Sequence, residues 1–313
     1  MLGKTAGGLY WMFRYLERSE NTARLVEAGF RIALTHSSVA EDEWKSVIST
    51  AGEKRAFSER HDRYTSENVV DFLLRDTSHA GSVMSMIEAA RSNARLVRTA
   101  LTREVWEATN ECCMTLRAVL GKQIPDRDLP FALRTIRQQS ALVRGAMHGT
   151  MLRNEMFNFA RLGTFIERGE STARILDVKY YVLLPSVSLV GTSLDTVQWE
   201  SILRSVSAAT AYRQVHGNDP HARTIADFLI FDGRMPRSLA FCRSKINGNL
   251  AYLAAEYGTR SDSQNLSESL SLRMAEESID TVFEYGLHQF IQDFIRDNNS
   301  LSANIEKDFR FNG

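Results

Sequence analysis

Two short segments of the chain carry the same glutamates and arginines. "ERSENTAR" occupies residues 17–24 and "ERGESTAR" occupies residues 167–174, and six of the eight letters agree. Carboxylates and guanidinium groups form strong, directional hydrogen bonds, so these segments could bind a cation, an anion or each other. The charged residues of both copies are therefore the first candidate site residues: Glu17, Arg18, Glu20, Arg24, Glu167, Arg168, Glu170 and Arg174.

On a helix, the acidic residues of the first copy fall on one stripe. Glu17, Glu20, Arg24 and Glu27 are spaced three and four residues apart, which keeps them on one helical face. An apolar stripe runs directly beside it and consists of Met12, Leu16, Ala23, Val26 and Phe30. The second copy repeats this pattern. Arg18 and Arg168 point elsewhere, roughly a third of a turn from the acidic stripe.

The repeated charges allow several interpretations. The simplest is a solvated face with ion pairs along the helix, each worth about 0.2–0.5 kcal/mol. Both copies, however, keep the same charged residues while the flanking apolar residues differ, which favours a specific role. That role could be a buried network that fixes how the two halves pack, or a site where arginines hold an anion. Four glutamates could also hold Mg²⁺, Mn²⁺ or Ca²⁺. Neither copy has the histidine of a di-iron bundle three residues on, so we assign no metal ligands, and the sequence leaves any cofactor open.

The repeat extends beyond the charged segment. "EWKSVI" around Trp44 matches "QWESIL" around Trp199, and "VVDFLLRD" from Val69 matches "IADFLIFD" from Ile225. The separation between copies grows slowly from 150 to 156 residues, as small loop insertions would produce, and Asn93 corresponds to Asn249 at the last offset. We interpret the chain as an internally duplicated, all-α helical bundle. Its halves are residues 1–130 and 131–313, with about five helices in each, packed together as one compact unit.

Apolar periodicity predicts helices throughout and almost no strand. The expected ranges are 8–34, 40–50, 67–75, 80–99 and 102–120, then 131–147, 152–184, 195–215, 221–231, 236–257 and 266–297. Pro185 should end the long helix, and Pro236 suits the first turn of another. The polar segment from Gly258 predicts a loop.

Composition excludes several classes of function. Lysines and arginines number 38, as do acidic residues, so the formal net charge is zero, which argues against general binding to nucleic acid or anionic membranes. No apolar run approaches the roughly 20 residues that span a bilayer, and the N-terminus lacks the layout of a signal peptide. Three cysteines without zinc-ligand spacing favour a cytoplasmic protein. The chain has no glycine-rich phosphate loop, no nucleophile elbow and no zinc-protease motif.

The sequence resembles the bacterial Alpha-E family over essentially its full length. The resemblance is carried by "LGKTAGGLYWMFRYLERSENTARLVE", "SALVRGAMHGTMLRNE" and "TMLRNEMFNFARLGTFIERGESTARILDVKYYVLLP". The segment "TMLRNE" adds Arg153 and Glu155 to the candidate residues. Members of this family are usually encoded beside, or fused to, a circularly permuted ATP-grasp ligase, often with a transglutaminase-like peptidase nearby.

The resemblance implies a helical partner of that ligase, in a system that forms amide bonds or modifies peptides. Two alternatives stay open. One is a stand-alone enzyme in which a glutamate between the halves acts as general base, and the other is a purely structural scaffold. Self-association and the substrate are also left open by the sequence.

Overall fold

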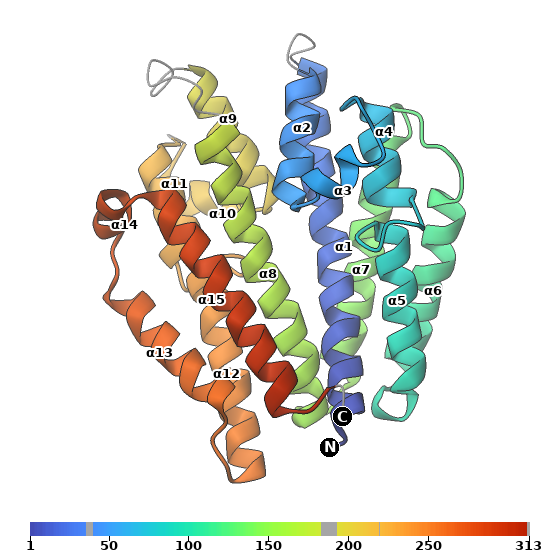
Figure 1. Ribbon diagram of the computed structural model, residues 1–313, viewed down its shortest axis with the longest axis vertical. Coiled ribbons are helices and arrows are strands. Elements are labelled where there is room, and N and C mark those ends of the chain that lie inside the picture. Colours follow the sequence, from blue (N-terminus) through green and yellow to red (C-terminus); the bar gives the residue numbers. More distant parts are fainter. Residues whose placement is uncertain (36–39, 183–192, 219, 312–313) are drawn as a thin grey trace. The chain divides into compact units, whose positions relative to one another are not determined.

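The computed structural model describes residues 1–35, 40–182, 193–218 and 220–311. All regular secondary structure within these ranges is helical, which confirms the predicted all-α class (Figure 1). The chain divides into two compact units. Unit 1 consists of residues 1–164 and 309–313, and unit 2 consists of residues 165–308.

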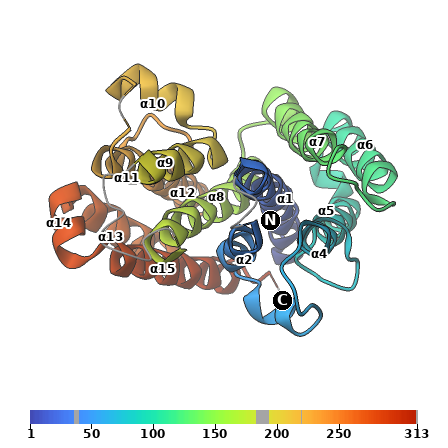
Figure 2. The ribbon, with the colours of Figure 1, turned by 90° about the horizontal axis from the view of Figure 1, so that it is seen from above.

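Unit 1 is built around four long helices: α1 (Gly3–Thr35), α5 (Val83–Leu96), α6 (Arg103–Leu120) and α7 (Leu129–Thr150). Helices α1 and α6 each contact both α5 and α7, so the four close into a bundle, seen from above in Figure 2. Shorter elements cover this bundle: α2 (Ala40–Ala51), α3 (Lys54–Ser58), α4 (Ser66–Val70), the π-helical turn η2 (Asp71–Arg75) and the 3₁₀ turn η3 (Arg98–Ala100). Side-chain caps mark the start of two bundle helices, α5 and α6. Ser82, for example, accepts a hydrogen bond from the backbone nitrogen of Ser85 at 3.2 Å.

Helix α8 (Glu155–Val182) begins in unit 1 and continues into unit 2. Within unit 1 it approaches α1 very closely at Gly163. A Cβ atom at this position would lie 2.0 Å from the backbone oxygen of Tyr10. Only glycine therefore permits this crossing of the two helices.

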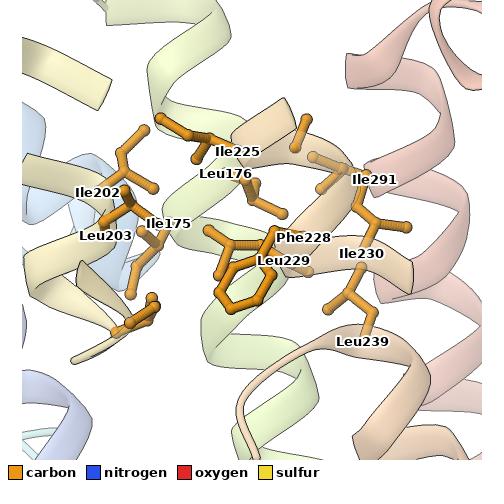
Figure 3. Packing of buried hydrophobic residues seen from close by; sticks show 14 of the residues in the cluster. Ile175, Leu176, Ile202, Leu203, Ile225, Phe228, Leu229, Ile230, Leu239 and Ile291 are labelled. Carbon is orange, nitrogen blue, oxygen red and sulfur yellow. The ribbon is translucent and has the colours of Figure 1, made fainter. Parts of the chain in front are cut away.

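The long helices of unit 2 are α8, α12 (Leu239–Tyr257), α13 (Asp262–Glu276) and α15 (Leu287–Asp308), and the shorter ones are α9 (Ser193–Ser205), α10 (Ala209–His216), α11 (Ala222–Phe231) and α14 (Ile279–Tyr285). Helix α13 contacts both α12 and α15. Helix α8 is tied to α15 because Asn298 donates to the carbonyl oxygen of Ile166 at 3.0 Å. The core includes Leu176 of α8, Phe228 of α11 and Ile291 of α15 (Figure 3).

The long helices of the two units follow the same order along the chain. Helices α1, α5, α6 and α7 would correspond to α8, α12, α13 and α15 if the chain arose by duplication. The order agrees with the repeated sequence segments, and the duplication itself stays a prediction. The division between residues 130 and 131 also stays a prediction, because it separates the duplicated halves and not the two units defined by contacts. By contacts, α7 packs on α1 and α6 and belongs to unit 1.

Three predicted details of the helices were wrong. The predicted helix 195–215 is interrupted, because Ser207 has a positive φ of 53° between α9 and α10. The predicted helix 266–297 is three helices, because a capping box between Ser278 and Thr281 starts α14, and Gly286, with φ of 109°, separates α14 from α15. Pro236 precedes α12, whose N-cap is Ser238.

Two further predicted boundaries lie at Gly258 and Pro185. The loop predicted from Gly258 is short, since α13 already begins at Asp262. The predicted end of the long helix at Pro185 lies outside the described residues.

Candidate functional site

The repeated glutamates of α1 are buried inside unit 1. Glu17 is 0% exposed and Glu20 is 1% exposed. The neighbouring apolar stripe explains this position, because Leu16 and Ala23 are also buried in the core and carry the adjacent glutamates inward. The interpretation of these residues as a solvated face was therefore wrong.

Arginines from two helices hold the Glu20 carboxylate. Nε and Nη2 of Arg24, one turn further along α1, donate to Oε1 of Glu20 at 3.0 and 2.5 Å. Arg144 of α7 pairs with Oε2 of the same carboxylate. Nη1 of Arg144 also lies 3.5 Å from Oε2 of Glu17. One half-buried arginine thus joins two buried glutamates across the α1–α7 interface, and buried carboxylates are tolerated inside a protein only when paired in this way.

The same interface contains a second ion pair further along α1. Glu27 pairs with Arg137 of α7 through Oε2, and its Oε1 accepts from Arg31 at 2.9 Å. Glu20 and Glu27 are seven residues apart, as are Arg137 and Arg144. Because the two helices run antiparallel, Glu20 meets Arg144 while Glu27 meets Arg137. Matched spacing of opposite charges therefore sets the register of α7 on α1.

The second copy of the motif is also buried, within unit 2. Glu167 is 4% exposed and Glu170 is 6% exposed. Arg174 donates to Oε1 of Glu170 from Nε at 3.1 Å and from Nη2 at 2.7 Å, the same geometry as in the first copy. The equivalent of Glu27 is Asp177, whose partners come from α15. His288 contacts one of its oxygens at 2.5 Å, and Gln292 donates to the other at 2.7 Å.

Three further candidate residues are the arginines Arg18, Arg168 and Arg153. Arg18 is half-buried on α1. Arg168 donates to the carbonyl oxygen of Pro236 at 3.4 Å and so ties α8 to the segment before α12. Arg153 donates to the carbonyl oxygens of His148 and Met151 at 2.6 and 3.2 Å, which stabilises the C-terminal end of α7.

Glu155 lies in the first turn of α8, where a carboxylate is favoured by the helix dipole. It forms an ion pair with the amino group of Met1 at 3.3 Å. This contact joins the start of the chain to the start of α8 within unit 1.

The sequence interpretation missed the two arginines on α7. Arg137 and Arg144 contribute from outside the repeated segment, so a search confined to that segment could not find them. Their seven-residue separation beside the apolar positions Ile136 and Val143 was the available signal, because it matches the spacing of Glu20 and Glu27.

This arrangement can cross-link helices. Each oxygen of Glu20 already faces a guanidinium group, so the carboxylate acts as an anchor for α7. In the described part of the chain, no group of three or more His, Cys, Asp and Glu side chains is placed to share a metal ion. The described helices also include none that is long and apolar enough to cross a bilayer.

Comparison with known proteins gives a family and no established activity. The model of the Alpha-E family, a predicted α-helical domain with a conserved ER motif, matches residues 1–309. An uncharacterised protein of Mycobacterium bovis is 22% identical over 280 residues, covering 80% of this chain and 30% of that protein. Two uncharacterised proteins of Mycobacterium tuberculosis strains match with the same identity and coverage. The chain thus spans less than a third of the length of these relatives. No solved structure matches.

Proposed function

Because the chain belongs to the Alpha-E family, we propose that it is the helical partner of an ATP-grasp-type ligase in a system that forms amide bonds or modifies peptides. In this proposal the ligase supplies nucleotide binding and carboxylate activation. The helical chain supplies a binding surface for the ligase and for the substrate that the ligase modifies. We also propose that both proteins work in the cytoplasm, in keeping with the three free cysteines.

The length of the mycobacterial relatives is the observation that carries this proposal. The matched segment makes up only 30% of each relative. In those proteins the helical segment is therefore joined covalently to a much longer stretch of chain. A helical domain that occurs as one part of a longer protein is well suited to act beside another domain, and the proposal assigns the same kind of association to this chain.

The buried ion pairs support a scaffold role for the repeated motif. The carboxylate of Glu20 is engaged by Arg24 and Arg144, and Glu170 is engaged by Arg174. The pairs of Glu20 with Arg144 and of Glu27 with Arg137 hold α1 and α7 in a fixed register, and a fixed register is what a rigid docking surface requires. The charged motif would then act on the partner indirectly, through the positions of the helices.

Mixing the purified chain with a circularly permuted ATP-grasp ligase from the same organism tests the proposal. We expect the two proteins to co-elute from a sizing column at micromolar concentration with MgATP, and the chain alone to show no ATP hydrolysis above background. Separate elution of two correctly folded proteins would overturn the proposed partnership.

A matched pair of variants tests the role of the scaffold. Arg144→Met should weaken co-elution, because it loosens the register of α7 on α1. Arg31→Met removes an arginine that is 60% exposed from the same network and should leave co-elution unchanged. Equal co-elution of both variants with the ligase would show that the buried ion pairs are not required for partner binding.

The stand-alone enzyme makes a different prediction for the same residues. A catalytic Glu17 would lose turnover as Glu17→Gln while the melting temperature stayed nearly constant. Glu17 is fully buried and paired with Arg144, so we expect the melting temperature to fall instead.

A further inference from the structure

Arg243 is a buried arginine without an anionic partner. It lies on α12 in unit 2 and is 4% exposed. Its Nε and Nη1 atoms are buried and form no hydrogen bond. Burial lowers the pKa of its guanidinium to about 10, although the charge of Asp297 opposes this change. Fully buried arginines are nearly always paired, so Arg243 is an exception among buried arginines.

Arg243 is one of the residues that line a cavity of about 260 Å³. The cavity lies within unit 2, among residues of α12, α13, α14 and α15. Its inner wall is apolar and includes Leu270, Val282 and Phe294, which are all buried. Tyr285 at its edge is 62% exposed, so the cavity is reached from solvent.

Phe294 positions the guanidinium group. The centre of the Phe294 ring lies 4.8 Å from Cζ of Arg243. Stacking of this kind covers one face of a guanidinium plane and uses none of the hydrogen-bonding directions at its edge. Arg243 is thus held on an aromatic ring while two of its nitrogens lack acceptors.

The acidic residues around the cavity already have partners of their own. Asp293 accepts hydrogen bonds from Tyr285 at 3.0 Å, Gln289 at 2.9 Å and Arg296 at 2.7 Å. Asp297 forms an ion pair with Arg273. These carboxylates therefore form their hydrogen bonds and ion pairs with other residues, and the charge of Asp297 acts on Arg243 from beyond that pair.

The corresponding position in the first copy of the repeated sequence carries no arginine. At the 156-residue offset that pairs Asn93 with Asn249, Arg243 corresponds to Ile87. Ile87 on α5 is 1% exposed and packs in the core of unit 1. Since an apolar side chain serves the corresponding helix, the buried arginine in unit 2 points to a role in binding.

We propose that the cavity beside Arg243 binds a small monocarboxylate with an apolar body about as large as a benzene ring. The carboxylate would accept hydrogen bonds from Arg243, and the apolar body would lie against Leu270, Val282 and Phe294. An apolar cavity of about 150 Å³ can hold benzene, so 260 Å³ leaves room for the added carboxylate. This inference does not depend on the proposed ligase partnership.

The charge of the surroundings favours a monoanion over a phosphate. Glu277 and Asp293 also line the cavity, and Asp297 lies close enough to influence Arg243. Their negative charges would repel a dianion more strongly than a single carboxylate. The carboxylate could belong to a free small molecule or to the C-terminus of a peptide, and these two sources share the same chemistry.

Binding measurements on the full chain test this site. Phenylacetate is the first probe, phenylacetamide is its neutral counterpart of the same shape, and inorganic phosphate is the dianion. We expect phenylacetate to bind in calorimetry and in saturation-transfer NMR. Its affinity should exceed that of phenylacetamide by at least about tenfold, because a hydrogen bond between two charged groups is lost in the amide. A short peptide ending in phenylalanine, with a free or an amidated C-terminus, distinguishes the peptide source from the free acid.

Two variants place the binding at Arg243. Arg243→Met should keep the fold, because methionine suits the apolar wall, and it should reduce phenylacetate binding at least about tenfold. Arg213→Met changes an exposed arginine on α10 of the same unit and should bind phenylacetate as the unchanged protein does.

Three outcomes would overturn the proposal. They are equal binding of phenylacetate and phenylacetamide, preference for phosphate, and no binding of any probe at millimolar concentration. The last would mean that water alone fills the cavity. The comparison of acid with amide uses the unchanged protein, so it stands even if Arg243→Met fails to fold.

Discussion

Arg144 on α7 forms an ion pair with Glu20 on α1, and the Glu20 side chain is only 1% exposed. The pair joins two long helices that are far apart in the sequence. A buried charge that loses its partner is strongly destabilising, whereas an exposed pair contributes little. The loss of stability caused by a substitution in this network should therefore depend on how deeply the substituted residue is buried.

Replacing Arg144 by methionine should lower the free energy of unfolding of unit 1 by about 3 kcal/mol. The change leaves Glu17 and Glu20 buried with less compensating charge. Urea unfolding followed by tryptophan fluorescence measures the effect, because Trp11, Trp44 and Trp106 all lie in unit 1. The control is Arg31→Met, which breaks an exposed pair with Glu27 and should cost about 0.5 kcal/mol or less. Similar losses in both variants would contradict this dependence on burial.

Glu20 and Arg144 should also show strong energetic coupling. In a double-mutant cycle with Glu20→Gln and Arg144→Met, the double variant should be more stable than the sum of the single changes predicts, by about 1.5–3 kcal/mol. The physical reason is that each single variant leaves the other member of the pair with less compensating charge, and the double variant removes both charges. Purely additive effects in the urea experiment would show that the two residues act independently.

Local spacing was sufficient to predict the helices that carry the motif. The three-and-four spacing of Glu17, Glu20 and Arg24 correctly predicted one stripe beside an apolar one, and both copies are helical. Burial and partners depend on tertiary packing, which a local pattern does not contain. Arg144 lies 127 residues from Glu17, so only the complementary seven-residue spacings on two helices could have suggested the contact.

The sequence interpretation also passed over Arg243. It lies in a segment where apolar residues recur with helical periodicity, and this periodicity identifies only the hydrophobic positions. Aligning the two copies of the repeated sequence would have identified Arg243, because this charged residue aligns with Ile87. The cavity itself was not predictable, since it depends on how α13, α14 and α15 pack around α12. The break before α14 arises from the local hydrogen bonds between Ser278 and Thr281, which are weaker signals than apolar periodicity.

Gly163→Ala should destabilise unit 1 by about 3 kcal/mol or more. The new Cβ atom would lie 2.0 Å from the backbone oxygen of Tyr10, and moving backbone atoms requires α1 and α8 to separate. The control is Gly145→Ala on α7, where a Cβ atom meets nothing within 4 Å. That change should stabilise the protein by about 0.5–1 kcal/mol through helix propensity. If thermal unfolding places both variants at the same midpoint, the close approach at Gly163 is wrong.

Glu43 should make the protein less stable as the pH rises. Burial in the first turn of α2 raises the pKa of this carboxyl from 4.5 to about 7. Between these two values the folded protein holds a proton that the unfolded chain releases, so stability falls as pH increases through this window. Below pH 4.5 and above pH 7, both states carry the same charge at this residue, and its contribution is constant.

Glu43→Gln should remove this dependence. The variant and the unchanged protein should be about equally stable near pH 4.5, and the variant should be more stable by about 2–3 kcal/mol at pH 8. Urea unfolding at a series of pH values measures the difference. Glu41→Gln, which alters an exposed carboxylate in the same turn, should follow the unchanged protein at every pH. A constant difference between Glu43→Gln and the unchanged protein would mean that Glu43 is ionised in the folded state throughout this range.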